Sequence, residues 1–221
     1  MTHCIYCEHT KVYTLANGHK KCAKCKRKFS PKKVTCQGEI VRAFCEGRVA
    51  HATAKTFGIH YQSVHKKYME LRRAIAYKSQ TDFEANLFRV KEYEEYIYMP
   101  RYKKAQMQAL YEAFDILIFD YEGKIYTTMI RIETRYTSHN TELKELKKIF
   151  GSRKIAKLQS RENKIERFIS FFEEYMNRFK GVGREQFFYY LKECEFCFNY
   201  AQDKRASLLE ALLSMSATPR V

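Results

Sequence analysis

The chain has 221 residues, of which 45% are apolar and 30% charged, with only 8 Gly and 3 Pro. This composition excludes collagen-like, low-complexity and mostly disordered chains, and no apolar run approaches the roughly 18 residues needed to span a bilayer. The formal net charge is +16, and residues 1–80 hold 17 Lys and Arg against 4 Asp and Glu, which places +13 in the first third. This asymmetry favours a polyanionic partner over a merely basic soluble surface.

Two Cys-x-x-Cys pairs open the chain: Cys4 with Cys7, then Cys22 with Cys25 after fourteen intervening residues. Two such pairs supply the tetrahedral sulfur set that Zn²⁺ prefers, and about 25 residues need a bound metal in order to fold. The alternatives are two disulfides or a redox pair. Because the N-terminus lacks the basic and apolar regions of a signal peptide, we expect a reducing cytoplasmic location, which disfavours disulfides. We predict a zinc ribbon over residues 1–34.

A run of basic residues passes through the second cysteine pair and continues beyond it. Such runs are often only solvated surfaces, but a folded metal module would hold this one in place and favour contact with phosphate. The residues that we expect to contact DNA phosphates here are Lys26, Arg27, Lys28, Lys32 and Lys33.

Residues 35–79 predict three helices: one that ends at Gly47, a short one at about 50–57, and one at about 61–77. The spacing of Ala54, Gly58 and Val64 is typical of a helix-turn-helix, in which a small residue allows close approach and Gly takes a positive φ in the turn. A three-helix bundle that does not contact DNA is the alternative. In the helix-turn-helix interpretation, base edges are read by Gln62 and Ser63, and phosphates are held by Lys66, Lys67 and Arg72.

The composition changes near residue 80, and residues 78–82 are expected to form a linker. Aromatic and β-branched residues then predict strands at 87–98, 113–120 and 124–132, with a hairpin turn at 121–123. Helices are expected at 141–150, from about 165 to a stop at 180–183, and at 184–201 and 207–215. We interpret Cys194 and Cys197, inside one of these helices, as core residues rather than metal ligands. The fold class is α+β, in several domains.

The order of these modules, together with the tail sequence, resembles bacterial insertion-sequence transposases of the zinc-ribbon, DDE (RNase H-like) type. The segment from Asn163 to Phe168 is similar to the family's Asn-x-Ile-Glu-x-Phe segment. Residues 179–199 are similar to its Phe-x-Gly-Val … Phe-x-x-x-Leu-Lys-Glu-x-Glu-x-x-x-Asn stretch. The resemblance implies a reduced RNase H-like strand group with a helical tail over residues 84–221.

The family's chemistry is DNA cleavage and joining by three carboxylates that hold two Mg²⁺ ions. The resemblance implies that Glu94 and Glu166 are two of these carboxylates. The third carboxylate of the family is expected on a strand after the hairpin, but no Asp lies between residues 132 and 155. Glu133, Glu142 and Glu145 are the acidic residues of this segment. The implied partner is the double-stranded DNA of element terminal repeats, bound by a homodimer in the bacterial nucleoid. A catalytically inactive remnant, a DNA-binding repressor and, more remotely, a zinc-ribbon transcription or RNA factor are the alternatives.

Overall fold

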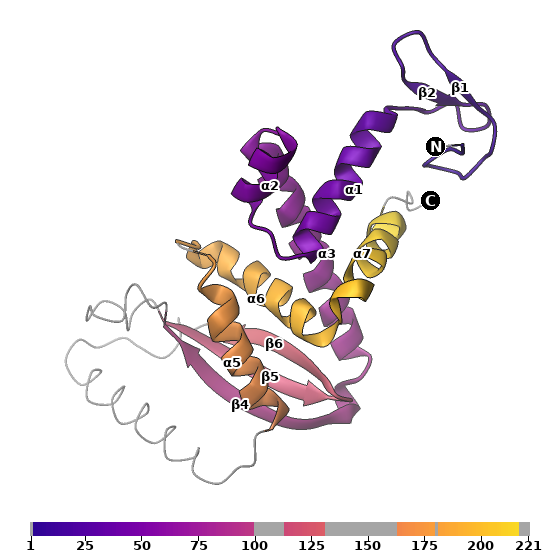
Figure 1. Ribbon diagram of the computed structural model, residues 1–221. Helices are drawn as coiled ribbons and strands as arrows, with labels where there is room; N and C mark the ends of the chain where they lie inside the picture. The colour runs from indigo at the N-terminus through magenta and orange to yellow at the C-terminus, as the bar shows by residue number, and fades with distance from the viewer. Residues whose placement is uncertain (1, 100–112, 131–162, 180, 217–221) are drawn as a thin grey trace. The chain divides into compact units, whose positions relative to one another are not determined.

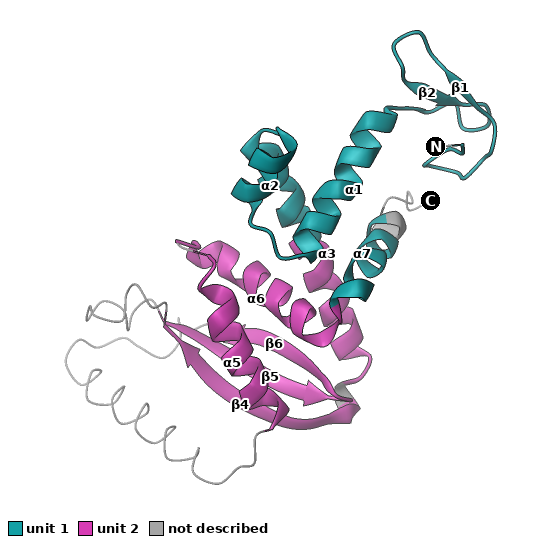
Figure 2. Cartoon of the chain, in the orientation of Figure 1, with its two compact units in different colours: residues 1–71, 202–221 teal, residues 72–201 magenta. Residues whose placement is uncertain are grey.

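A computed structural model describes residues 2–99, 113–130, 163–179 and 181–216 (Figure 1). Within these ranges the chain is α+β, with six α-helices and two three-stranded antiparallel sheets, as predicted. It divides into two compact units, one made of residues 1–71 and 202–221 and the other of residues 72–201 (Figure 2). The C-terminal helix, at residues 202–216, therefore groups with the N-terminal residues, whereas the sequence predicted it in a domain of residues 84–221.

The first unit begins with a small sheet of β1 (Val12–Thr14), β2 (Lys20–Cys22) and β3 (Lys28–Phe29) in the order β1-β2-β3. We refer to residues 2–34 as the ribbon. Its core is small, because Phe29 is the only buried residue besides two cysteines, and the half-buried Val12 and Val34 pack against it.

Helices make up the rest of the first unit: α1 (Pro31–Cys45), α2 (Ala50–Phe57), the start of α3 (Tyr61–Glu84) and α7 (Gln202–Ser216). The hydroxyl of Ser30 caps α1 by accepting a hydrogen bond from the Lys33 N–H at 3.4 Å. Gly58 ends α2 with a φ of 62°, a conformation that costs Gly little. The core of these helices includes Phe44, Ala54, Val64 and Tyr68, as well as Leu209 of α7.

Helix α3 is longer than the sequence predicted. It runs through residues 78–82 to Glu84, so the expected linker is helical and the helix passes from the first unit into the second. The segment contains no Gly or Pro, and two side-chain pairs spaced four residues apart, Lys78 with Asp82 and Gln80 with Glu84, support it.

The second unit contains the larger sheet, in the order β4-β5-β6: β4 (Val90–Tyr98), β5 (Phe114–Tyr121) and β6 (Lys124–Ile130). A 3-10 turn, η1 (Leu87–Arg89), replaces the first residues of the expected strand. The predicted hairpin is confirmed: Glu122 and Gly123 join β5 to β6 with φ values of 47° and 73°, which match a two-residue turn with positive φ at both positions.

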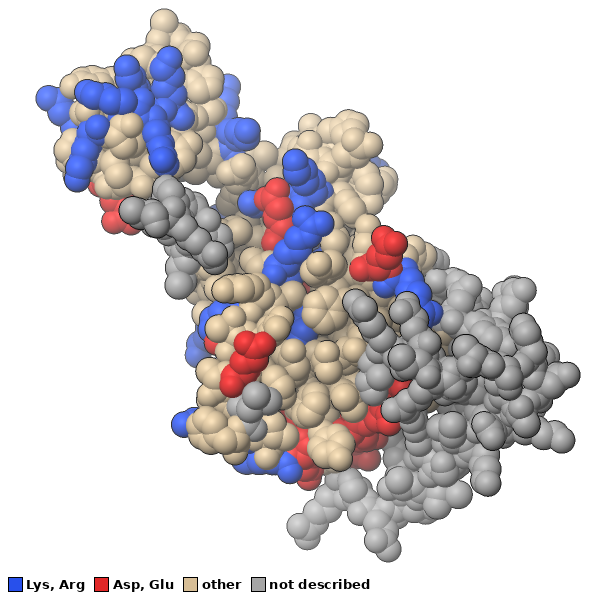
Figure 3. Space-filling model, turned by 180° about the vertical axis from the view of Figure 1, so that it is seen from behind, with Lys and Arg blue, Asp and Glu red and all other residues tan. Residues whose placement is uncertain are grey.

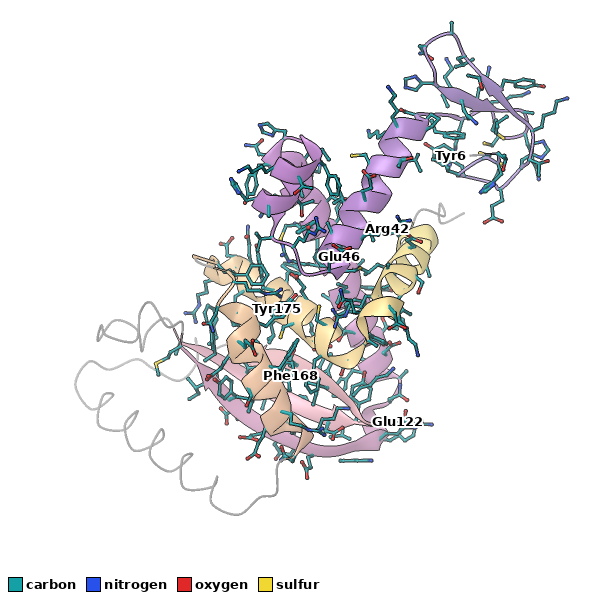
Figure 4. The ribbon with its side chains drawn as sticks, in the orientation of Figure 1. Tyr6, Arg42, Glu46, Glu122, Phe168 and Tyr175 are labelled. Atoms are coloured by element: carbon teal, nitrogen blue, oxygen red, sulfur yellow. The ribbon has the colours of Figure 1, made fainter. Side chains whose placement is uncertain are left out.

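One face of this sheet is covered by α5 (Lys164–Met176) and α6 (Arg184–Asn199). Phe168 of α5 is fully buried (Figure 4). Aromatic rings join the layers: Phe187 stacks on Phe114 with centroids 3.7 Å apart, and Phe172 meets Tyr98 edge-on at 4.9 Å. Near β6, Phe83 of α3 stacks on Tyr126 at 3.8 Å. The helix expected at 141–150 lies outside the described residues.

Candidate metal centre and nucleic-acid interface

The four N-terminal cysteines meet at one point of the ribbon. The Sγ atoms of Cys4 and Cys25 are 3.6 Å apart, as are those of Cys7 and Cys22, and all four lie within 4.8 Å of one another. A disulfide requires about 2 Å, so the thiols are unbonded. Four sulfurs around a tetrahedral Zn²⁺ would be about 3.8 Å apart, and the cluster is therefore compatible with a zinc site.

The two cysteine pairs have the same backbone geometry. The N–H of Cys4 donates to the carbonyl of His9 at 2.9 Å, and the N–H of Cys22 donates to the carbonyl of Arg27 at 3.0 Å. The residue after each pair has a positive φ, 57° at Glu8 and 58° at Lys26. Such values cost a non-glycine residue about 1–2 kcal/mol. The repeated, strained turn therefore indicates that holding the sulfurs in place outweighs local backbone preference.

Backbone N–H groups also point at sulfur. Tyr6 N–H donates to the Cys4 Sγ at 3.4 Å, and the Cys22 Sγ accepts from Lys24 N–H at 3.3 Å and Cys25 N–H at 3.4 Å. Burial raises the pKa of the Cys22 thiol, but these N–H donors and the neighbouring thiols outweigh burial and lower it to about 6. The Arg27 N–H lowers the pKa of the Cys25 thiol, but burial and hydrogen bonds to the other three cysteines outweigh it and raise that pKa to about 11. The cluster without metal therefore favours thiolate, the form that binds metal, at Cys22 but not at Cys25.

Basic side chains gather on the ribbon (Figure 3). Residues 1–34 hold nine Lys and Arg against one acid, Glu8. All five residues predicted to contact phosphate in this segment are exposed: Lys26, Arg27, Lys28, Lys32 and Lys33. The ribbon therefore presents a cationic surface.

The start of α3 has one buried and one exposed side. Val64 is fully buried, while Gln62, Ser63 and Lys66 are exposed. Lys67 forms an ion pair with Glu70 at 3.1 Å. The predicted base-reading and phosphate-binding residues at this helix start therefore lie at the surface, and Lys67 shares its charge with a carboxylate.

The prediction for Arg72 is wrong. This residue is 2% exposed, and its Nε lies 2.6 Å from a carboxylate oxygen of Glu193. Position 72 turns away from the exposed residues of the first turns, so its guanidinium is buried in the second unit and is not presented to DNA.

Glu94 and Glu166 lie on facing elements. On β4, Glu92 accepts a hydrogen bond from the Asn163 amide at 3.3 Å, and the Tyr96 hydroxyl donates a hydrogen bond to the Glu173 carboxylate of α5. Glu94 lies between Glu92 and Tyr96 on the same face of β4, because alternate residues of a strand point to the same side. Glu166 lies on α5, two turns before Glu173. Among the described residues, however, only the four cysteines form a group of three or more possible ligands this close together. Glu133, Glu142 and Glu145 lie outside those residues.

Sequence reasoning missed the aromatic residues of the ribbon. Tyr13 is 50% exposed and Tyr6 47%, and each has a cation beside its ring: Lys11 lies 5.9 Å from the Tyr13 centroid and Arg27 lies 5.1 Å from that of Tyr6. Figure 4 marks Tyr6 on the first cysteine turn. For Tyr13 the available signal was its place in a hairpin strand next to Val12, which packs on the ribbon core; Tyr6 lies in a turn, where no such alternation marks it.

The remaining cysteines do not join the metal group. Cys45, Cys194 and Cys197 are buried and Cys36 is half-buried, and none of these four forms a disulfide. Burial raises the pKa of Cys194 well above its ordinary value, which supports a role in the core.

No helix in the described part of the chain has the length and apolarity to cross a membrane. Comparison with protein-family models, curated proteins and solved structures found no match.

Proposed function

We propose that the chain binds double-stranded DNA through residues 1–79, either as the front end of an insertion-element transposase or as a repressor derived from one. The observation that carries the proposal is the polar, exposed start of α3, where Gln62, Ser63 and Lys66 lie opposite the buried Val64. With α2 and the turn at Gly58, it would act as a helix-turn-helix whose second helix enters the major groove.

The chemistry of these side chains supports two different roles. The Gln62 amide and the Ser63 hydroxyl have the donors and acceptors that pair with base edges. Lys66 and the ribbon cations can only neutralise phosphate, which contributes affinity without reading sequence. The zinc-bound ribbon would hold its cations at fixed positions along the same DNA.

The resemblance to transposases also supports a proposal about which DNA is bound. The DNA would be the terminal repeats of an element, and two copies of the chain would bind two ends, since a two-fold dimer matches a pair of equivalent sites.

The test uses the full zinc-loaded chain and labelled duplexes of about 30 base pairs, including a site selected from random sequence. Binding should weaken steeply with salt, by a slope of about 0.9 per phosphate contact. Lys66→Ala should weaken all duplexes alike and lower that slope by about one, whereas Gln62→Ala should narrow the gap between the selected and a scrambled site. Lys204→Ala, which changes an exposed lysine of α7, is the matched control. A flat salt response would contradict the proposal.

Strand cleavage is the second candidate function, and the facing positions of Glu94 and Glu166 favour it. Each residue would offer carboxylate oxygens to Mg²⁺, which when bound supplies Lewis-acid activation of a water or hydroxyl. Glu166→Gln should then abolish Mg²⁺- or Mn²⁺-dependent nicking of element ends and leave DNA binding intact. Glu185→Gln is the matched control, because Glu185 is the acidic residue in the first turn of α6, as Glu166 is in α5. Nicking that survives Glu166→Gln would exclude the role.

A further inference from the structure

The outer face of the ribbon sheet has a regular row of side chains. Tyr13 of β1 lies opposite Lys21 of β2, and Lys21 lies opposite Lys28 of β3. The neighbouring residues Cys22 and Phe29 are buried in the ribbon core. Because successive side chains of a strand point to opposite faces, the Tyr13–Lys21–Lys28 row faces outward.

This row works against the stability of the ribbon. Like charges directly opposite each other on neighbouring strands are destabilising, and among the described residues neither Lys21 nor Lys28 forms an ion pair with an acid. The half-exposed ring of Tyr13 also leaves apolar area in water, although the ribbon core has only one buried residue other than cysteine. An anion between the lysines and a flat partner on the ring would offset both costs.

A second ring repeats the arrangement on the first cysteine turn. Tyr6 meets Phe29 edge-on, with centroids 6.3 Å apart and an interplanar angle of 83°, so the buried Phe29 holds its orientation. Arg27 lies 5.1 Å from the Tyr6 centroid. The ribbon thus presents two half-exposed rings, each beside a cation.

We infer that the ribbon is a binding site for single-stranded DNA, in which Tyr13 and Tyr6 stack on unpaired bases while Lys21, Lys28 and Arg27 contact the phosphates. Alternation of rings and cations is the chemistry of sequence-independent single-strand binding. The faces of bases inside a duplex are covered by their neighbours, so half-exposed rings gain partners only where the strands are open. The inference rests on the proposed DNA binding and shares the ribbon cations Arg27 and Lys28 with it, but it adds Tyr13, Tyr6 and Lys21 and assigns a different form of DNA.

The experiment measures binding of the full zinc-loaded chain to labelled oligo-dT of about 15 nucleotides, to oligo-rU of the same length and to a duplex. Tyr13→Ala and Tyr6→Ala should each weaken oligo-dT binding about tenfold, with the salt slope and the duplex affinity unchanged. Tyr13→Phe should bind as the wild type does, since it keeps the ring. Lys21→Ala and Lys28→Ala should instead lower the salt slope by about 0.7 each.

Tyr77→Ala is the matched control, because Tyr77 is 70% exposed on α3 and should have no effect. Zinc content, measured for every variant, shows that the ribbon remains folded. Wild-type binding to duplex but not to oligo-dT would overturn the inference and leave the proposed function standing. Binding to oligo-dT but not to duplex would contradict the proposed duplex binding and support the single-strand site. Tyrosine variants that bind oligo-dT like the wild type, or a tenfold preference for oligo-rU, would also overturn it.

Discussion

Arg72 and Glu193 form an ion pair inside the second unit, with their side chains 3% and 4% exposed. The second carboxylate oxygen of Glu193 accepts a hydrogen bond from the Tyr175 hydroxyl at 2.7 Å, and the guanidinium lies 3.8 Å from the centroid of the Tyr190 ring. The pair therefore connects α3, α5 and α6. Each charge is tolerated there only while the other is present, because an unpaired buried charge keeps its full desolvation cost.

Arg72→Ala should accordingly lower the free energy of unfolding of the second unit by about 3–5 kcal/mol. Urea denaturation followed by circular dichroism measures the change. Arg73→Ala, at the exposed neighbouring position, should shift it by about 0.5 kcal/mol or less. Equal effects of the two substitutions would contradict the burial argument.

Removal of zinc should unfold the ribbon and leave the second unit folded. The ribbon core has too few apolar residues to offset the entropy of ordering the chain, so we expect metal binding to supply the folding energy. Cys22→Ser should lose the bound zinc, measured as metal content after dialysis, whereas Cys36→Ser should retain one equivalent. Hydrogen exchange before and after chelation would locate the change. Full protection of residues 2–29 in the metal-free chain would refute the prediction.

The positive φ of Glu8 makes a separate prediction about zinc affinity. Glu8→Val should bind zinc about tenfold more weakly than Glu8→Gly, because a positive φ is strained for a β-branched residue and unstrained for Gly. Thr10→Val compared with Thr10→Gly is the control, since the φ of Thr10 is not positive. Competition with a chromogenic chelator measures both pairs, and an equal ratio at the two positions would contradict the argument.

Features of this chain that depend on residues close in sequence are predictable from spacing, whereas features that depend on distant residues are not. The turn at Glu122–Gly123 and the clustering of Cys4, Cys7, Cys22 and Cys25 depend on residues close in sequence, and spacing alone predicted them. The burial of Arg72 depends on Glu193, which is 121 positions away, and no local pattern marks an arginine that will be paired so far along the chain.

The course of α3 shows a second limit of sequence reasoning. The change of composition near residue 80 suggested a linker, yet a polar segment without Gly or Pro is equally compatible with an exposed helix. Phe83 packs on Tyr126 at the end of this helix, and that tertiary contact favours the helical state. The grouping of α7 with the first unit also depends on tertiary contacts, such as the Arg205 side chain on the Cys45 carbonyl at 3.4 Å.

Alkaline pH should destabilise the second unit through its buried tyrosines. Burial of the ring, and then the carboxylates of Glu195 and Glu84, raise the pKa of Tyr126 to about 12. Burial, followed by nearby carboxylates, raises the pKa of Tyr96, Tyr121 and Tyr175 as well. Unfolded tyrosine titrates near pH 10, so the folded state holds these protons more tightly. The resulting stability is complete below about pH 10 and is lost as pH rises toward 12.

The free energy of unfolding should therefore fall between about pH 10 and 12, and the ultraviolet absorbance of ionised tyrosine should rise together with the loss of helix signal. Tyr126→Phe keeps the ring stacked on Phe83 but removes the titrating hydroxyl, so its stability should fall less steeply over this range. Tyr77→Phe, at an exposed phenol, should follow the wild-type profile. If Tyr126→Phe and the wild type lose stability in parallel, the Tyr126 hydroxyl is not among the groups that cause the alkaline unfolding.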